Sequence, residues 1–310
     1  MLSYRKLAMR VLGHPLHTGG GIDSPRPASQ RAAAFILTAA MLTTLAAPAF
    51  AKTWYIEDGD ITVKASDTGN DVTQKDKTTY GDKDTIITNR KEDASSNTVT
   101  IEAEKKDDKV EVTLKDVNID TSSRKKAAVS VTGEGDTNIK LNGDNALKSD
   151  IYRSGIYGSG SGSLTISGGE NDSLTAQGGS GANGISSSGS LTISGGTITA
   201  NGDDGGSGIY SRGGVTISGG STVTANGESG TISGGDGICS SGGVTISGGS
   251  TVTANGGDGQ DGYGGDGIRS SSGGVTISGG TVTANGGNST NSSGGYGISS
   301  LDVAISSGTV

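Results

Sequence analysis

Apolar and polar residues alternate in short runs along the chain after residue 52. In Val215-Thr216-Ile217-Ser218, for example, Val215 and Ile217 fall on one face and the two polar residues on the other. This period of two predicts half-buried strands of roughly three to five residues. Gly-Gly or Asn-Gly pairs follow these runs, and both residues tolerate turn conformations that β-branched residues avoid. No stretch of this region has a convincing helical period, so the pattern predicts an all-β protein.

The predicted strands belong to a unit that recurs six times from residue 155 onward. The unit reads Gly-Ile, then (Leu/Val)-Thr-Ile-Ser-Gly-Gly, then (Thr/Ser)-(Ile/Val)-Thr-Ala-Asn-Gly. Because one such unit cannot bury its apolar face alone, units of this kind stack on their neighbours as a solenoid. Three short strands per coil predict a parallel β-helix, with about nine coils at roughly 4.8 Å each. The second phrase starts at Leu164, Leu191, Val215, Val244, Val275 and Val303.

Composition divides the chain into three parts. Residues 1–51 read as an export signal, with basic residues up to Arg31, an apolar run and the small-x-small site Ala49-Phe50-Ala51. Residues 52–150 carry 16 basic and 21 acidic residues and read as irregular early coils, continuous with the later ones. Residues 151–310 are the glycine-rich regular repeats. A secreted or cell-surface protein is expected, with no membrane span after the signal.

Charge and missing residue types exclude several functions. Without the signal the chain carries 19 basic and 31 acidic residues, a net charge of about −12, which argues against nucleic acid and anionic membranes as partners. His14 and His17 both lie in the signal, and Cys239 is the sole cysteine. Ser-His-Asp, Cys-His and zinc-histidine sites are therefore excluded after residue 52. Cys239 is interpreted as an ordinary substitution in the variable position after Gly-Ile.

Aspartates in the glycine-rich loops are candidate ligands for calcium. Calcium prefers six to eight oxygen ligands, and stacked coils can bring loop carboxylates and carbonyls together. The segment 256–264 matches the calcium-binding nonapeptide G-G-x-G-x-D-x-U-x once. The alternative is that the aspartates merely keep the loops solvated. The candidate metal ligands are Asp203, Asp204, Asp236, Asp258, Asp261 and Asp266.

Four tyrosines and one arginine are candidate carbohydrate-binding residues. Tyr157 and Tyr210 occupy the outward position after Gly-Ile, and Tyr263 and Tyr296 lie in loops. Tyrosine suits a sugar because its ring covers the apolar C–H face while its hydroxyl meets the polar edge. Arg269 is one of very few basic residues after residue 148, and next to Asp266 it is also the best available pair for a lyase. Ordinary turn tyrosines are the alternative interpretation.

Two kinds of polar residue recur at fixed positions in the repeats. Outward Thr-x-Thr pairs form two threonine columns that resemble those of ice-binding solenoids, although threonine also simply suits exposed strands. Asparagines recur after Thr-Ala, and they predict either an internal ladder of stacked amides or turn residues with positive φ. The asparagines are Asn201, Asn226, Asn255 and Asn285.

The segments 112–119 and 141–145, together with the repeated Leu-Thr-Ile-Ser-Gly-Gly, carry a family resemblance over most of residues 85–310. The chain resembles secreted bacterial carbohydrate-binding proteins, which are built on a right-handed parallel β-helix and include calcium-assisted binders of pectin-like polysaccharide. The resemblance implies a non-catalytic protein that binds an extracellular polysaccharide, with Ca²⁺ as a possible cofactor. The alternatives are a structural or adhesive surface β-helix, such as an autotransporter passenger fragment, and a polysaccharide lyase. End-to-end self-association is a further expectation, because Val310 directly follows the last strand phrase.

Overall fold

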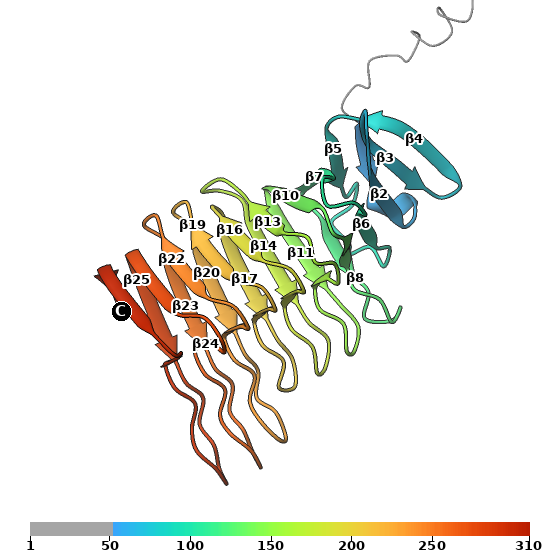
Figure 1. Ribbon diagram of the computed structural model, residues 1–310. Helices are drawn as coiled ribbons and strands as arrows, with labels where there is room; N and C mark the ends of the chain where they lie inside the picture. The colour runs from blue at the N-terminus through green and yellow to red at the C-terminus, as the bar shows by residue number, and fades with distance from the viewer. Residues whose placement is uncertain (1–51) are drawn as a thin grey trace, which may run out of the picture. The chain divides into compact units, whose positions relative to one another are not determined.

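The structure is a computed structural model that describes residues 52–310, so the predicted export signal at 1–51 lies outside the described residues. Residues 52–310 form a parallel β-solenoid of about nine coils, as the repeat predicts. The single helical element in this part of the chain is the 3₁₀ turn η1 (Ile56–Asp58). Each regular coil contributes one strand to each of three faces, which we call faces 1, 2 and 3 (Figure 1).

Face 1 is formed by the strands that include the Leu/Val-Thr-Ile-Ser phrase. Its strands pair in parallel from β1 to β27, and β25 is long enough to continue from face 1 into face 2. The strands of face 1 are β1 (Lys52–Tyr55), β5 (Thr85–Thr88), β7 (Lys109–Lys115), β10 (Asp136–Asn142), β13 (Leu164–Ser167), β16 (Leu191–Ser194), β19 (Val215–Ser218), β22 (Val244–Ser247), β25 (Val275–Asn285) and β27 (Val303–Thr309).

Face 2 carries the Thr-x-Thr-Ala-Asn phrase and ends in the second half of β25. Its other strands are β8 (Asn118–Asp120), β11 (Asp144–Lys148), β14 (Ser173–Gln177), β17 (Thr197–Asn201), β20 (Thr222–Asn226) and β23 (Thr251–Asn255). Face 3 carries the Gly-Ile phrase. Its nine parallel strands are β2 (Ile61–Ser66), β6 (Val99–Ala103), β9 (Val129–Gly133), β12 (Ile156–Gly158), β15 (Ile185–Ser187), β18 (Ile209–Ser211), β21 (Ile238–Ser240), β24 (Ile268–Ser270) and β26 (Ile298–Ser299).

The core consists of apolar columns that run along the solenoid axis. On face 1, for example, Ile193 pairs with Ile217 and Ile217 with Ile246, and all three side chains are fully buried. Face 3 contributes an isoleucine at the same position of consecutive coils. Each buried side chain of this size contributes about 1.5–3 kcal/mol before the entropy cost of folding. Stacking of the predicted strands in register therefore provides the hydrophobic core.

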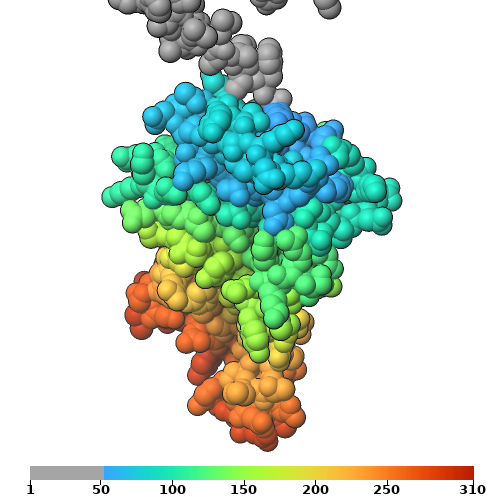
Figure 2. All heavy atoms as spheres, turned by 90° about the vertical axis from the view of Figure 1, so that its right-hand side faces the viewer, coloured from blue at the N-terminus to red at the C-terminus, as the bar shows by residue number. Residues whose placement is uncertain are grey.

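The first coils depart from the expected purely parallel stacking. After β2, the strands β3 (Gly69–Gln74) and β4 (Lys77–Asp82) turn back, so that β2, β3 and β4 pair antiparallel at the edge of face 3. A two-residue connection with Lys75 at positive φ joins β3 to β4, which is the geometry of a tight hairpin. In Figure 2 this cap (blue to cyan) covers the N-terminal side of the coils. The cap is closed by buried Trp54, whose Nε1 donates to Asp82 Oδ2 at 2.9 Å.

No helix within residues 52–310 has the length and apolar character needed to cross a bilayer.

Candidate functional site

The loops that join face 2 to face 3 lengthen toward the C-terminus and extend from one side of the solenoid (Figure 1). The three long loops are 227–237, 256–267 and 286–297, and we call them together the fin. Their outer parts stack in parallel through bridges between Gly230 and Gly259 and between Gly259 and Ser289. The fin is therefore an ordered extension of the coils and not a set of independent loops.

Glycine is required at the base of the fin because two arms of each loop and the neighbouring loop pack backbone against backbone. The N–H of Gly257 donates to Gly235 O, that of Gly265 to Gly257 O, and that of Gly287 to Gly265 O, each at 2.8 Å. A Cβ atom on Gly265 would lie 1.9 Å from Gly235 O, far inside van der Waals contact. Side chains are thus excluded here by the close approach of the arms.

A polar ladder, consisting of the residues that precede each Gly-Ile pair, runs along the base of the fin. The N–H of Asp236 donates to Ser207 Oγ at 3.2 Å, that of Asp266 to Asp236 Oδ1 at 2.7 Å, and that of Tyr296 to Asp266 Oδ1 at 2.7 Å. Each side-chain oxygen thus holds the backbone of the next coil. Sequence reasoning missed this ladder, although residues with a side-chain oxygen stand before every Gly-Ile: Ser154, Asn183, Ser207, Asp236, Asp266 and Tyr296.

A groove of about 430 Å³ lies between the returning arms of the fin and face 3. This volume falls within the range of about 300–1,000 Å³ that is typical of ligand sites. Residues from four successive coils line the groove, over an axial length of about 14 Å at the strand spacing. Five of the residues singled out from the sequence meet in this groove: Asp236, Tyr263, Asp266, Arg269 and Tyr296.

Asp236 is the buried acid of the groove, with 8% of its surface exposed. Burial raises the pKa of Asp236 above its ordinary value, although the N–H of Asp266, the Cys239 thiol and Arg269 each favour the carboxylate. Arg269 Nη1 lies 3.7 Å from Asp236 Oδ2. Burial, together with Asp236, raises the pKa of Cys239 to about 12, so its thiol stays protonated and unreactive.

The two tyrosines of the groove are open to solvent. Tyr263 is 65% exposed and Tyr296 is 71% exposed, so their rings are available to a ligand. Tyr157 and Tyr210 take their expected place on the outer side of face 3, but they do not line the groove. Tyr157 pairs with Ser186 and Ser186 with Tyr210, so the two rings stand two coils apart.

The remaining aspartates hold loops in position. Asp258 Oδ1 accepts the backbone N–H of Asn288 at 2.6 Å, and Asp261 Oδ1 accepts Asn291 Nδ2 at 3.1 Å. Asp204 has positive φ, and its carboxylate accepts the Ser180 hydroxyl. Within residues 52–310, no three Asp, Glu, His or Cys side chains gather closely enough to hold an ion. Calcium binding by these aspartates therefore stays a prediction, without a carboxylate cluster to support it.

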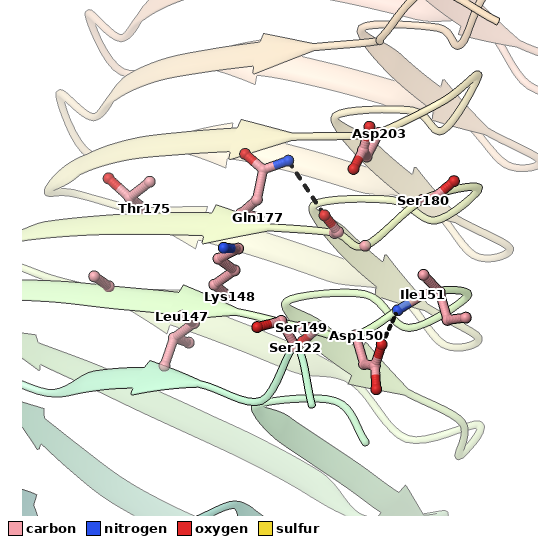
Figure 3. A pocket seen from close by; sticks show the side chains of 13 residues that line it. Ser122, Leu147, Lys148, Ser149, Asp150, Ile151, Thr175, Gln177, Ser180 and Asp203 are labelled. Atoms are coloured by element: carbon pink, nitrogen blue, oxygen red, sulfur yellow. Dashed lines mark hydrogen bonds between the residues drawn. The ribbon is translucent and has the colours of Figure 1, made fainter. Parts of the chain in front are cut away.

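A larger hollow of about 570 Å³ lies on the other side of the loops, over β11 and β14 (Figure 3). Lys148 and Gln177 line the hollow from the strands, and Asp150 and Asp203 line it from the loops. Asp203 is the one candidate ligand there, and no aromatic ring lines the hollow. The carboxylate of Asp150 is occupied by the backbone N–H groups of Lys125 and Ile151. The smaller groove is therefore the better candidate site for a sugar.

The asparagine columns form the ladder of amides that was one of two alternatives. Asn226 Nδ2 donates to Asn201 Oδ1, Asn255 Nδ2 to Asn226 Oδ1, and Asn285 Nδ2 to Asn255 Oδ1, at 2.8–2.9 Å. None of these residues has positive φ, which excludes the turn interpretation. The ladder was predicted to be internal, but it lies on the outer side of face 2, because the Ile or Val and the Ala of each strand point inward.

Comparisons of the chain with known protein families, with curated proteins and with solved structures found no match.

Proposed function

We propose that this protein is a non-catalytic polysaccharide-binding solenoid and that the groove at the base of the fin binds the sugar chain. The observation that carries the proposal is that Tyr263, Tyr296, Arg269 and two aspartates from separate coils line one groove. Aromatic rings supply contact with the apolar faces of pyranoses, and the charged groups supply hydrogen bonds to their hydroxyls. The sequence resemblance to secreted carbohydrate-binding β-helices supports the same function.

The groove is suited to a polymer because it follows the solenoid axis across several coils. Its walls are the glycine-rich arms of the fin, which backbone hydrogen bonds hold to one another. A polysaccharide lying along the axis would contact Tyr263 and Tyr296 in succession.

The proposal is tested by affinity electrophoresis of the purified protein in gels that contain soluble polysaccharides. The double variant Tyr263→Ala/Tyr296→Ala is expected to lose about 2 kcal/mol or more of binding free energy, as is typical of aromatic hot spots. The matched control is Tyr157→Ala/Tyr210→Ala, which removes two tyrosines outside the groove. Equal retention of the two double variants, or the absence of retention of the wild-type protein by every polysaccharide, would reject the proposal.

Catalysis is not part of the proposal, because Arg269 is a poor candidate base. An arginine side chain stays protonated in proteins, and the guanidinium of Arg269 is already next to Asp236. Incubation with polygalacturonate is expected to release no unsaturated uronides. Their appearance would favour the lyase alternative.

A structural or adhesive role at the cell surface is a second candidate, favoured by the outer side of face 2. From β14 to β25 its outward positions carry only Ser, Thr, Gln and Asn, in register along the axis. These positions form an uncharged and regular surface. Attachment of cells or particles that depends on this face, without glycan retention, would favour this second function.

A further inference from the structure

We propose that the groove selects a neutral polysaccharide over a polyuronate and does so without calcium. This inference rests on the proposed function and concerns the chemical class of its ligand. It starts from the charges of the groove. Three charged residues line it: two aspartates and one arginine.

The single cation of the groove lies close to an aspartate. Arg269 Nη1 is 3.7 Å from Oδ2 of the nearly buried Asp236, so the charge of Asp236 partly offsets that of the guanidinium. The other basic residues of 151–310 are Arg153 and Arg212, and neither lines the groove. A uronate carboxylate would therefore meet two aspartates and only one partly neutralised guanidinium, an arrangement that disfavours binding by like-charge repulsion.

The hydrogen-bonding capacity of Asp266 also favours hydroxyls. Its Oδ1 accepts the N–H of Tyr296, whereas its Oδ2 accepts no hydrogen bond from the described residues. An ionised carboxylate only accepts hydrogen bonds, so a ligand must bring a donor to Oδ2. A ring hydroxyl of either class of polymer is such a donor, whereas the carboxylate that distinguishes a polyuronate is an acceptor and is repelled by Oδ2.

A calcium ion that bridged the groove and a polyuronate would find few ligands on the protein. No group of three acidic, histidine or cysteine side chains comes together in residues 52–310. Asp236 and Asp266 each already use one oxygen to hold the backbone of the next coil. The polymer and water would have to supply most of the six to eight oxygens that calcium prefers, so the groove gives such an ion little support.

The test uses affinity electrophoresis of the purified protein against a neutral set (mixed-linkage β-glucan, galactomannan, xyloglucan, dextran) and an anionic set (polygalacturonate, alginate). Each gel is run with chelator and with millimolar calcium. Retention by at least one neutral polysaccharide in chelator, with none by the anionic set, is the expected result. Retention by an anionic polysaccharide alone, or only with calcium, would overturn the inference and leave polysaccharide binding intact. No retention by any polymer would overturn the proposed function as well.

The variant Asp266→Asn makes the test specific to the groove. Asparagine can still accept the N–H of Tyr296, but it offers a donor where the aspartate has a free acceptor, and it removes one negative charge. Neutral binding is expected to weaken by about tenfold, the loss of one hydrogen bond to a charged group. Retention by polygalacturonate is expected to increase.

The matched control is Asp258→Asn, in a carboxylate that holds the next coil in the same way but does not line the groove. It is expected to bind as the wild type does. If Asp266→Asn leaves both neutral and anionic retention unchanged, or if Asp258→Asn changes them equally, the inference is wrong.

Discussion

The two regions of the solenoid share an apolar core but hold their surfaces together by different means. Eight of the nine ion pairs within residues 52–310 join residues of 52–150, whereas the repeats of 151–310 have one. The repeats instead use columns of amides and of side-chain oxygens that bond from coil to coil. Regular coils place the same side chain above itself, which suits an amide that is both donor and acceptor but not a charge. The difference teaches that the regular repeats are held by hydrogen-bond ladders from coil to coil, whereas ion pairs are concentrated in the irregular early coils.

Substitutions in the shared core are expected to reduce the free energy of unfolding most. Ile139 in the early coils and Ile217 in the repeats are both fully buried on face 1. Replacing either by alanine is expected to lower the free energy of unfolding by about 2–5 kcal/mol, measured by chemical denaturation. A much smaller loss at one of the two positions would show that the core is not equivalent in the two regions.

The fin is the next most sensitive part. Gly265→Ala places a Cβ atom against Gly235 O and is expected to cost about 1–3 kcal/mol and to expose the fin to limited proteolysis. Gly294→Ala is the milder comparison, because its Cβ would lie 3.2 Å from Gly287 O and needs only a small shift of the backbone. Equal protease resistance of the two variants would contradict the close packing of the arms.

The amide ladder is predicted to contribute without dependence on salt. Asn226→Ala removes hydrogen bonds to Asn201 and from Asn255, so a loss of about 1–3 kcal/mol is expected. Thermal unfolding at low and at high ionic strength is the measurement. A loss that disappears in high salt would mean that the ladder acts through charge.

Removing an ion pair of the early coils should reduce stability least. Unlike the loss of the amide ladder, this reduction should depend on salt. Asp60 contacts Lys126 at 2.9 Å and Arg124 at 3.1 Å at a solvent-accessible site. Asp60→Asn is expected to cost about 0.2–1 kcal/mol at low salt and less at high salt. The same thermal scans check this outcome, and a cost that grows with salt would contradict it.

Acidification should change the contributions of Asp60 and Asp236 to stability in opposite directions. Burial alone would raise the pKa of Asp60, but hydrogen bonds from Lys126 and Thr98 outweigh it and hold the pKa below its ordinary value. The stabilisation by Asp60 is therefore present above a pH of about 3.9 and is lost as the pH falls through the lowered pKa. Asp236 has a raised pKa, so its contribution is largest below about pH 3.9 and declines as the pH rises through the raised value.

Unfolding against pH, with the variants Asp60→Asn and Asp236→Asn, measures these two slopes. Relative to the wild type, Asp60→Asn should lose its disadvantage in acid, and Asp236→Asn should gain as the pH rises. Slopes of the same sign for both variants would contradict the opposite environments of the two carboxyls.

Much of the architecture was predictable because the same residue types recur at the same positions of each repeat. The position of Ile217 between Ile193 and Ile246 follows directly from the recurring phrase and the period of two. The antiparallel cap was not predicted, because Lys75-Asp76 is not one of the Asn-Gly or Asp-Gly pairs that mark a two-residue hairpin turn. The alternation of residues 61–82 is equally compatible with parallel coils.

The site was only partly predictable. Arg269, Asp266 and the loop tyrosines were candidates because of their residue types. Their position in one groove with Asp236 was not predicted. Their convergence depends on the stacking of long glycine loops, and a glycine run reads equally well as a solvated loop. The ladder that fixes Asp236 and Asp266 was missed because its members differ in residue type and share only the position of an oxygen.

The most direct test of the account is hydrogen–deuterium exchange of the protein with and without the polysaccharide that retains it. The account predicts added protection confined to the groove, in segments 233–236, 263–269 and 293–296, with none in residues 52–150. Protection centred on β11 and β14 around Lys148, or spread over the charged early coils, would contradict the assignment of sugar binding to the fin.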